Sequence, residues 1–289
     1  DLKLEDDIKL DHVGTISFNG KTLHTGAKSL TWSGSNQVWY QAADLTLGGD
    51  LTLNSTIVFD GASTATSYVI GNNHTINMND NCIFVAEGHT LRLENLTIMD
   101  LKGSSSAGSE TAWSTAGAIC MESNAVLEIK NVTIILASGS DYYFARGTID
   151  VLEGGFLKIL PGATAGEFIY DTSARHLNIK SNAKLGIGRD ALFRYHSTTA
   201  TEIEFEDSTS ELEIVGGQLN AYRDWTMAKG TLLVDGKSTF QVVDLQAVTM
   251  DATNKPDIVV MPGATFSVTT TGYKSDGTTR TTGDFVYNE

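Results

Sequence analysis

The charged residues between positions 171 and 224 are the part of this sequence that could do chemistry. Carboxylates that converge can bind Ca²⁺, or they can act as the acid and the base of glycoside hydrolysis. The set, which we call the charged constellation, comprises Asp171, Arg175, Arg189, Asp190, Arg194, Arg223 and Asp224. Its members are scattered through predicted turns, and no two aspartates are paired along one wall. A salt-bridged surface is therefore the favoured interpretation, with catalysis as the alternative.

Two histidines occupy matching places, His74 in "NHTI" and His89 in "GHTL", each directly before a predicted strand. A metal site would need both on one face, together with a third ligand. Because they are 15 residues apart in the sequence, they do not fit a stacked arrangement. We interpret them as turn residues, and the sequence predicts no metal and no other cofactor.

Four tyrosines recur at intervals of 27, 25 and 27 residues, namely Tyr143, Tyr170, Tyr195 and Tyr222. This spacing would stack them into one row along a repeat protein. Rings that face inward would fill the core, whereas rings that face outward would form a platform for sugar rings. The neighbouring residues leave both possibilities open, because "FIY" favours Tyr170 inside while "LNAY" would then bury Asn220.

Four asparagines begin Asn-x-Ser/Thr triplets, namely Asn54, Asn73, Asn95 and Asn131. Such triplets are acceptor sites for N-glycosylation in exported chains. They also arise wherever an asparagine turn precedes a threonine-rich strand. We take the second explanation as the default, unless the host glycosylates the protein.

The elements that must position these residues form a repeat. Its template is an apolar-x-apolar pair, a short turn and a second such pair, as in "GHTLRLENLTIMD" from Gly88. A third apolar stretch follows, such as "EFIY" from Glu167. The second anchors, at intervals of 28, 27, 28 and 26 residues, are Leu157, Leu185, Leu212, Phe240 and Phe266. A fixed period this short predicts a solenoid.

Three short strands in each coil of about 27 residues, alternating inward and outward, predict an all-β parallel β-helix over residues 1–289. The residues between the anchors should face solvent, namely Arg92, Glu128, Lys158, Glu213 and Gln241. The period fails between Ile76 and Leu91 and between Leu91 and Leu127, which indicates a misassigned anchor or an insertion. We expect residues 102–117 to form a polar loop that projects from the wall. Residues 269–289 are predicted to be a C-terminal cap or tail.

The composition agrees with many short strands, because 41% of the residues are apolar, glycine occurs 28 times and proline three times. A net charge of −15 would repel nucleic acid and anionic membranes. The sequence contains no run of 18 apolar residues, so it predicts no transmembrane helix. Cys82 and Cys120 form no CxxC pair, so we expect buried free thiols or one disulfide between neighbouring coils. A start at Asp1, without an apolar leader, fits a mature exported chain, extracellular or on the cell surface.

Two segments, "EGHTLRLENLTIMD" from Glu87 and "STAGAICMESNAVLEIKNVTI" from Ser114, carry a resemblance to a known group. They resemble right-handed parallel β-helix proteins of the pectin-lyase-like kind, particularly surface and adhesin-type members. Asn95 and Asn131 match the turn asparagine whose amides stack between coils in that group. "TAGAI" is similar to the Gly-Gly-Ala-Ile signature of autotransporter passengers and polymorphic outer-membrane proteins, but it departs from that signature at Thr115 and Ala116.

The resemblance implies a fold that carries lyases, hydrolases, adhesins and inert scaffolds. Its lyases would need clustered carboxylates for Ca²⁺ and an arginine base, and the sequence lacks the paired aspartates. We therefore expect a non-catalytic structural or adhesive protein that binds cell-surface glycans or associates with itself. The alternative is a polysaccharide lyase or glycoside hydrolase. End-to-end stacking into a filament or surface layer would use the first coil and outward apolar positions, namely Leu2, Leu4, Leu233 and Val259.

Overall fold

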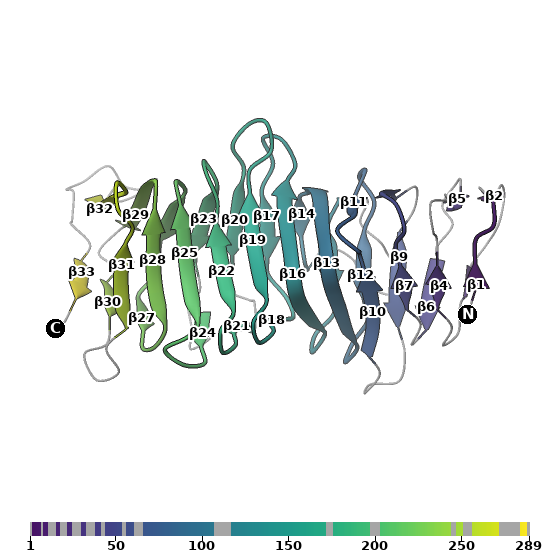
Figure 1. Ribbon diagram of the computed structural model, residues 1–289, viewed down its shortest axis with the longest axis horizontal. Helices are drawn as coiled ribbons and strands as arrows, with labels where there is room; N and C mark the ends of the chain where they lie inside the picture. Colours follow the sequence, from purple (N-terminus) through teal and green to yellow (C-terminus); the bar gives the residue numbers. More distant parts are fainter. Residues whose placement is uncertain are drawn as a thin grey trace.

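A computed structural model describes residues 2–6, 8–10, 16–17, 22–24, 30–32, 38–41, 44–53, 56–60, 66–106, 117–171, 176–196, 203–243, 247–250, 256–271 and 284–287. These residues form strands and turns, with no helix among them. Every strand pair within them is parallel. The strands are stacked along one long axis with the two termini at opposite ends (Figure 1). The chain is an all-β parallel β-helix solenoid, as predicted.

The largest sheet, which we call the main sheet, runs the length of the molecule. Its strands in spatial order are β1 (Leu2–Lys3), β4 (Leu23–His24), β7 (Leu45–Thr46), β10 (Thr66–Ile70), β13 (Thr90–Leu101), β16 (Val126–Leu136), β19 (Phe156–Leu160), β22 (Lys184–Ile187), β25 (Glu211–Val215), β28 (Thr231–Asp235) and β31 (Asp257–Val260). Further strands attach beside this path, namely β8 (Leu51–Thr52), β11 (Thr75–Asn77), β18 (Thr148–Val151), β21 (His176–Ile179) and β24 (Ile203–Phe205).

Two sheets cover the remaining face of the coils. The β3–β15 sheet belongs to the N-terminal half and contains β3 (Ile16–Ser17), β6 (Val38–Gln41), β9 (Ile57–Asp60), β12 (Ile83–Val85) and β15 (Ile119–Met121). The β14–β32 sheet belongs to the C-terminal half and contains β14 (Gly103–Ser104), β17 (Tyr142–Phe144), β20 (Glu167–Tyr170), β23 (Leu192–Tyr195), β26 (Gln218–Ala221), β29 (Lys237–Val243) and β32 (Thr265–Thr271). Two small sheets contain β2 (Ile8–Leu10) with β5 (Leu30–Trp32), and β27 (Trp225–Met227) with β30 (Ala247–Met250) and β33 (Asp284–Tyr287).

Asparagine corners bend the two longest strands, β13 and β16. Asn95 and Asn131 have φ angles of 50° and 59°, in the left-handed region that asparagine tolerates better than most residues. The part of β13 before Asn95 pairs with β10, and the part after it pairs with β11. The side-chain amide of Asn131 donates a hydrogen bond of 2.9 Å to Oδ1 of Asn95. The two asparagines therefore form the amide stack that the resemblance implies.

The predicted period is confirmed in the middle of the chain, where Leu157 lies opposite Leu185 and Leu185 opposite Leu212. After Leu212 the predicted anchors are wrong. Leu212 pairs with Leu232, only 20 residues later, so this coil is short. Phe240 and Phe266 belong instead to the β14–β32 sheet.

The irregular spacing near the N-terminal half also has a structural explanation. Ile76 lies opposite Ile98 and not opposite Leu91, so Ile76 and Leu91 belong to different columns of the main sheet. Leu91 does lie opposite Leu127, 36 residues later, so this coil is long. The extra residues include part of the predicted loop 102–117. The first residues of that loop form strand β14, and residues 107–116 lie outside the described residues.

The predicted C-terminal cap or tail begins inside strand β32 and includes strand β33. Both strands pair with preceding strands of the solenoid, β29 and β30, so these parts continue the coil. Residues 272–283 and 288–289 lie outside the described residues. No helix in the described part of the chain is long and apolar enough to span a bilayer.

The core consists of stacks of like side chains from successive coils. Phe168 and Phe193 stack with ring centroids 5.4 Å apart, and Trp225 stacks on Phe240 at 6.1 Å. Aliphatic stacks run beside these rings, and each fully buried leucine or isoleucine stabilises the fold by about 1.5–3 kcal/mol. All five residues predicted to face solvent are at least partly exposed. Among them, Arg92 Nη2 lies 2.6 Å from the carboxylate of Glu128 on the next coil.

Candidate functional site

The predicted tyrosine row is divided between the two faces of the β14–β32 sheet. Tyr170 and Tyr195 are fully buried and stack with ring centroids 5.7 Å apart. Tyr143 is 39% exposed, because strand alternation places its neighbour Tyr142 inside. Tyr222 follows Ala221, the buried last residue of β26, and is half-buried on the outer face. This corrects the prediction of a single row, since two rings fill the core and two lie outside.

The outer tyrosines belong to a surface that we call the polar-aromatic strip, formed by Tyr143, Glu167, Arg194, Asn220 and Tyr222. Strands β17, β20, β23 and β26 position these residues, and Arg194 lies directly opposite Asn220. The guanidinium of Arg194 lies over the ring of Tyr222, with 4.9 Å between Cζ and the ring centroid. Arg194 also forms an ion pair with the carboxylate of Glu167. The strip therefore joins aromatic rings, a cation and a carboxylate across adjacent coils.

Side-chain amides extend the strip toward the C-terminal coils. Nε2 of Gln218 donates hydrogen bonds to Oδ1 of Asn220 at 2.6 Å and to Oε1 of Gln241 at 3.1 Å. Asn220 lies on the outer side of β26, because its neighbour Leu219 lies opposite the buried Phe240, but its side chain is only 5% exposed. The amides hold one another in place, so their remaining donors and acceptors have fixed positions.

Two titratable groups of this region have shifted pKa values. Burial raises the pKa of Glu167, while Arg194 opposes the shift and the Asp141 carboxylate adds to it. Asp141 Oδ1 accepts a 2.9 Å hydrogen bond from the backbone N–H of Glu167, so the two carboxylates belong to neighbouring coils. Burial lowers the pKa of His196, whose ring meets that of Tyr222 edge-on at 6.2 Å. The neutral imidazole is therefore favoured at pH 7.

The charged constellation does not converge on one point. Asp171 and Arg223 both act electrostatically on His196, so they lie beside the strip. Arg189 and Asp190 lie on the turn before β23, at the other end of that strand. Arg175 lies outside the described residues. Among the described residues, the members of the constellation therefore lie in separate places, with Asp171, Arg194 and Arg223 near His196 and with Arg189 and Asp190 at the other end of β23.

Arg189 and Asp190 instead border a hollow of about 470 Å³ at the corner between the main sheet and the β14–β32 sheet. Stacked turns form its floor, with Gly216, Gly236 and Gly263 at φ angles of 67°, 63° and 82°. A Cβ atom added at Gly263 would meet no atom within 4 Å, whereas one added at Gly236 would lie 3.4 Å from the backbone nitrogen of Gly216.

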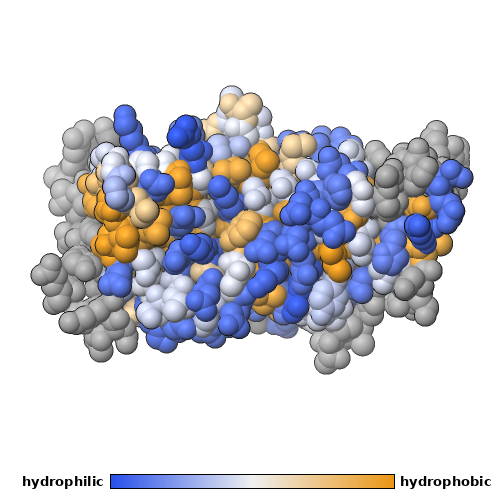
Figure 2. Space-filling model, in the orientation of Figure 1, coloured by the Kyte–Doolittle hydropathy of each residue, from blue (hydrophilic) through white to orange (hydrophobic). Residues whose placement is uncertain are grey.

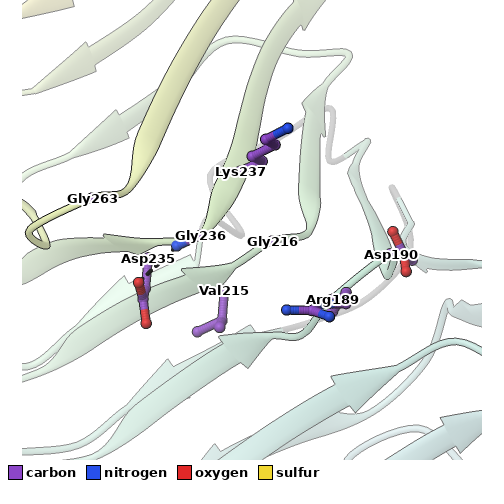
Figure 3. A pocket seen from close by; sticks show the side chains of 8 residues that line it. All are labelled: Arg189, Asp190, Val215, Gly216, Asp235, Gly236, Lys237 and Gly263. Carbon is purple, nitrogen blue, oxygen red and sulfur yellow. Dashed lines mark hydrogen bonds between the residues drawn. The ribbon is translucent and has the colours of Figure 1, made fainter.

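Figure 3 shows four charged side chains around this hollow, from Arg189, Asp190, Asp235 and Lys237. All four side chains are exposed to solvent, so none is set apart as a buried acid or base. The corner can donate hydrogen bonds to a polar ligand and accept them from it. Its charged side chains do not form the buried pair of titratable groups that acid–base catalysis uses.

The four asparagine triplets lie in different surroundings. Asn73 is exposed in a turn with φ of 68°. Asn95 and Asn131 are half-buried and bonded to each other. Asn54 lies outside the described residues. Glycosylation of these residues stays a prediction, and Asn73 is the one most accessible to a modifying enzyme among the three described.

The histidines of the matching motifs do not come together. His74 is partly exposed, and its Nδ1 lies 3.6 Å from the carboxylate of Asp50. His89 is fully buried, with Nε2 3.1 Å from Oγ of Ser67. Its backbone lies in a turn as expected, but its ring belongs to the core. No cluster of three or more potential metal ligands occurs in the described residues.

Cys82 and Cys120 are both buried and both free. They lie on adjacent coils, since Ile83, which follows Cys82, is opposite Ile119. A hydrogen bond between the two thiols, together with burial, raises the pKa of Cys120. The Cys120 thiol therefore stays protonated, and both cysteines are buried and free, in line with the interpretation of buried free thiols.

Sequence reasoning missed several residues of the strip and of the hollow, namely Asp141, Glu167, Gln218, Asp235 and Lys237. Glu167 and Gln218 each begin an apolar stretch that was recognised, so the period-two alternation of those stretches could have placed them outside. No comparable signal identifies the hollow, which depends on how the turns of four coils stack.

Comparisons with known proteins identify no relative: no family model, no curated protein and no solved structure matches this chain.

Proposed function

We propose that the protein is a rigid, non-catalytic β-helix of the cell surface or extracellular space, with a structural or adhesive role, and that the polar-aromatic strip binds a glycan. The observation that carries this proposal is the outward arrangement of Tyr143, Arg194 and Tyr222 along one sheet, with the buried Ile169 between Tyr143 and Arg194 in the same column. The resemblance of the strands around Asn95 and Asn131 to surface and adhesin-type pectin-lyase-like proteins supports it.

The chemistry of the strip suits a sugar polymer. The exposed ring of Tyr143 and the half-buried ring of Tyr222 can pack against the C–H face of a sugar ring, and the amide of Gln218, held in place by Asn220, can bond to its hydroxyls. Side chains in one column recur at the strand spacing of about 4.8 Å. A linear polymer that lies along the solenoid axis would therefore pass over one outward side chain of this column on each coil, in the order Tyr143, Ile169, Arg194, Asn220 and Gln241. The net charge of −15 favours neutral over acidic polymers.

A glycan-binding measurement with three variants tests this proposal. Tyr143→Ala and Tyr222→Ala should each weaken binding to a neutral polysaccharide about fivefold, which corresponds to about 1 kcal/mol for a lost ring contact. Phe156→Ala is the matched control, because Phe156 is an aromatic residue of similar exposure on the main sheet, away from the strip. Equal losses for all three variants, or no binding by the parent protein to any glycan of a broad array, would contradict the proposal.

A second candidate function is cleavage of a polysaccharide, and one observation favours it. Glu167 has a raised pKa, faces Arg194 and lies one coil from Asp141. Glycoside hydrolysis requires two nearby carboxyl groups, and the one that acts as the general acid has a raised pKa, as Glu167 does. Release of new reducing ends or unsaturated products from a polysaccharide panel would establish this activity. Its loss in Glu167→Gln, Arg194→Ala or Asp171→Ala would overturn the non-catalytic proposal.

A further inference from the structure

The outer apolar side chains that the sequence suggested as assembly contacts do not gather on one surface. Leu4 is buried, so it is unavailable as a contact. Leu233 is half-buried opposite the exposed Val259, whereas Leu2 lies on β1 at the other end of the main sheet. The main-sheet face mixes hydrophobic and hydrophilic side chains (Figure 2). End-to-end stacking therefore stays a prediction, and the polar-aromatic strip holds the more specific arrangement.

Arg194 lies at the centre of the polar-aromatic strip and connects three successive coils. Its guanidinium forms an ion pair with the carboxylate of Glu167 on the preceding coil. The same guanidinium lies over the ring of Tyr222 on the following coil, with 4.9 Å between Cζ and the ring centroid. A change in charge beside Arg194 therefore acts on the aromatic part of the strip as well.

The ring of Tyr222 packs against two side chains of one coil. Arg194 lies over its face, and the ring of His196 meets it edge-on at 85°, with centroids 6.2 Å apart. The backbone of Tyr222 is fixed, because its N–H donates a 2.8 Å hydrogen bond to the carbonyl of Tyr195 on the neighbouring coil. The direction of the ring therefore depends on Arg194 and His196.

The ion pair that holds Arg194 is largely shielded from water. The Glu167 side chain is 17% exposed and the Arg194 side chain 32%, so their attraction is stronger than that between two fully exposed ions. Burial raises the pKa of Glu167, while Arg194 opposes the shift and the Asp141 carboxylate adds to it. Glu167 therefore takes up a proton at a higher pH than an exposed glutamate does. The neutral carboxyl group then no longer attracts the guanidinium as an ion.

Charged groups from three elements surround His196. Asp171 follows β20, Arg194 belongs to β23, and Arg223 lies just after β26. Burial lowers the pKa of His196, the two arginines add to the shift, and Asp171 opposes it. A protonated His196 would be a third cation beside Arg194 and Arg223. It would repel Arg194 and compete with it for the electron-rich face of Tyr222.

We propose that protons taken up in mild acid detach the Arg194 guanidinium from the ring of Tyr222, so that acid disorders the strip. One proton goes to His196 and adds a cation that repels Arg194, and the other goes to Glu167 and removes the anion that holds it. Glu167 and His196 are thus positioning residues, which act on Tyr222 through Arg194. The transition should lie between about pH 6.5 and pH 4.5, because the ordinary pKa of histidine is lowered here and that of glutamate is raised.

The consequence for ligand binding rests on the proposed function. A sugar that packs on the ring of Tyr222 binds best when the ring is already held in place, so a glycan bound at pH 7 should be released in acid. The change within the strip needs no glycan. The two statements are therefore tested separately.

Solution NMR of the full chain, without any glycan, tests the change in the strip. The ring current of Tyr222 should displace the side-chain proton signals of Arg194 upfield, and Tyr222→Ala identifies this displacement by removing it. In the parent protein the displacement should be present at pH 7 and lost by about pH 4.5. His196→Gln should retain part of it in acid, since one of the two steps is missing. Glu167→Gln should have a smaller displacement already at pH 7, since the amide carries no charge.

His176→Gln is the matched control. His176 is a partly exposed histidine with Nδ1 3.5 Å from the carboxylate of Glu204, and it lies in β21, away from the strip. Its replacement should leave the displacement and its pH dependence unchanged. A displacement that persists in the parent protein down to about pH 4.5 overturns the proposal, and so does a pH profile that neither His196→Gln nor Glu167→Gln alters. Unfolding of the coils over the same range, seen by circular dichroism, overturns it too, because the loss would then not be local.

Binding of a soluble neutral β-glucan connects the strip to the proposed function. The parent protein should bind this probe about fivefold more weakly at pH 5 than at pH 7, which is the loss expected for one ring contact. Tyr222→Ala, which already lacks the ring, should show no such pH dependence. Constant binding by the parent protein, together with a lost displacement, would overturn the release of the glycan. A lost displacement in a protein that binds no glycan of a broad array at pH 7 would support the change in the strip and contradict the proposed function instead.

Discussion

Replacement of Asn131 separates the two physical roles of the asparagine corner. The residue has φ of 59° and donates a 2.9 Å hydrogen bond to Asn95 on the preceding coil. Asn131→Ala loses the hydrogen bond, worth about 1 kcal/mol, and places alanine in the left-handed region at about 1–2 kcal/mol. The expected loss in the free energy of unfolding is about 2–3 kcal/mol.

Asn131→Gly loses the same hydrogen bond without the left-handed strain. Because glycine adds conformational freedom to the unfolded chain, the expected loss is about 1–2 kcal/mol, less than for alanine. Asn124 provides the control, since it has φ of 62° in an exposed turn and its side chain forms no hydrogen bond with the described residues. Asn124→Ala should cost only the strain of about 1–2 kcal/mol.

Urea unfolding monitored by circular dichroism measures these differences, provided that all variants give the same slope against denaturant. Hydrogen exchange at the amides of β13 and β16 localises the effect. The reasoning is refuted if Asn131→Gly destabilises the protein as much as Asn131→Ala. It is equally refuted if Asn131→Ala costs no more than Asn124→Ala, since the amide stack would then contribute nothing.

Three other perturbations have expected outcomes. Burial lowers the pKa of His89, and Asp60 opposes this shift. Because the unfolded state binds the proton more tightly, the free energy of unfolding should fall as the pH drops below about 6.5. His89→Gln should flatten that part of a plot of unfolding free energy against pH. Phe193→Ala removes a fully buried ring stacked on Phe168 and should cost about 3–5 kcal/mol in denaturant unfolding, and a loss under 1 kcal/mol would argue against the stacked core. Gly71→Ala would press a methyl group onto the backbone oxygen of Asn95 and should lower the free energy of unfolding by about 1–3 kcal/mol. Gly186→Ala is the control, because its nearest neighbours lie at 3.7 Å, and it should shift the thermal midpoint by little in either direction.

Sequence reasoning recovers the solenoid wherever the coils are regular. The intervals between Leu157, Leu185 and Leu212 are close to one period, and these residues do lie opposite each other. The reasoning fails where a coil changes length. The eight residues from Leu232 to Phe240, for example, lead from the main sheet to the β14–β32 sheet. That is why Phe240 was assigned to the column of Leu212 although it lies opposite Leu219.

The candidate site was harder to predict than the fold. Tyr143 and Tyr170 differ by 27 residues, yet they face opposite sides of their sheet because Tyr143 is shifted by one residue from the stack of Phe144, Tyr170 and Tyr195. A single-residue shift reverses the direction of a side chain, and a period counted over whole coils does not detect it. The pairing of Arg194 with both Glu167 and Tyr222 depends on three coils at once.

The distance between spin labels at Thr133→Cys and Val259→Cys tests the stacked coils most directly. These positions lie in one outward column, five strand spacings apart, so pulsed electron resonance should give a narrow distribution near about 24 Å between the backbone sites. The native Cys82 and Cys120 are buried and stay unlabelled in the folded protein. A broad distribution, or a mean beyond about 40 Å for five spacings of a sheet, would contradict the solenoid.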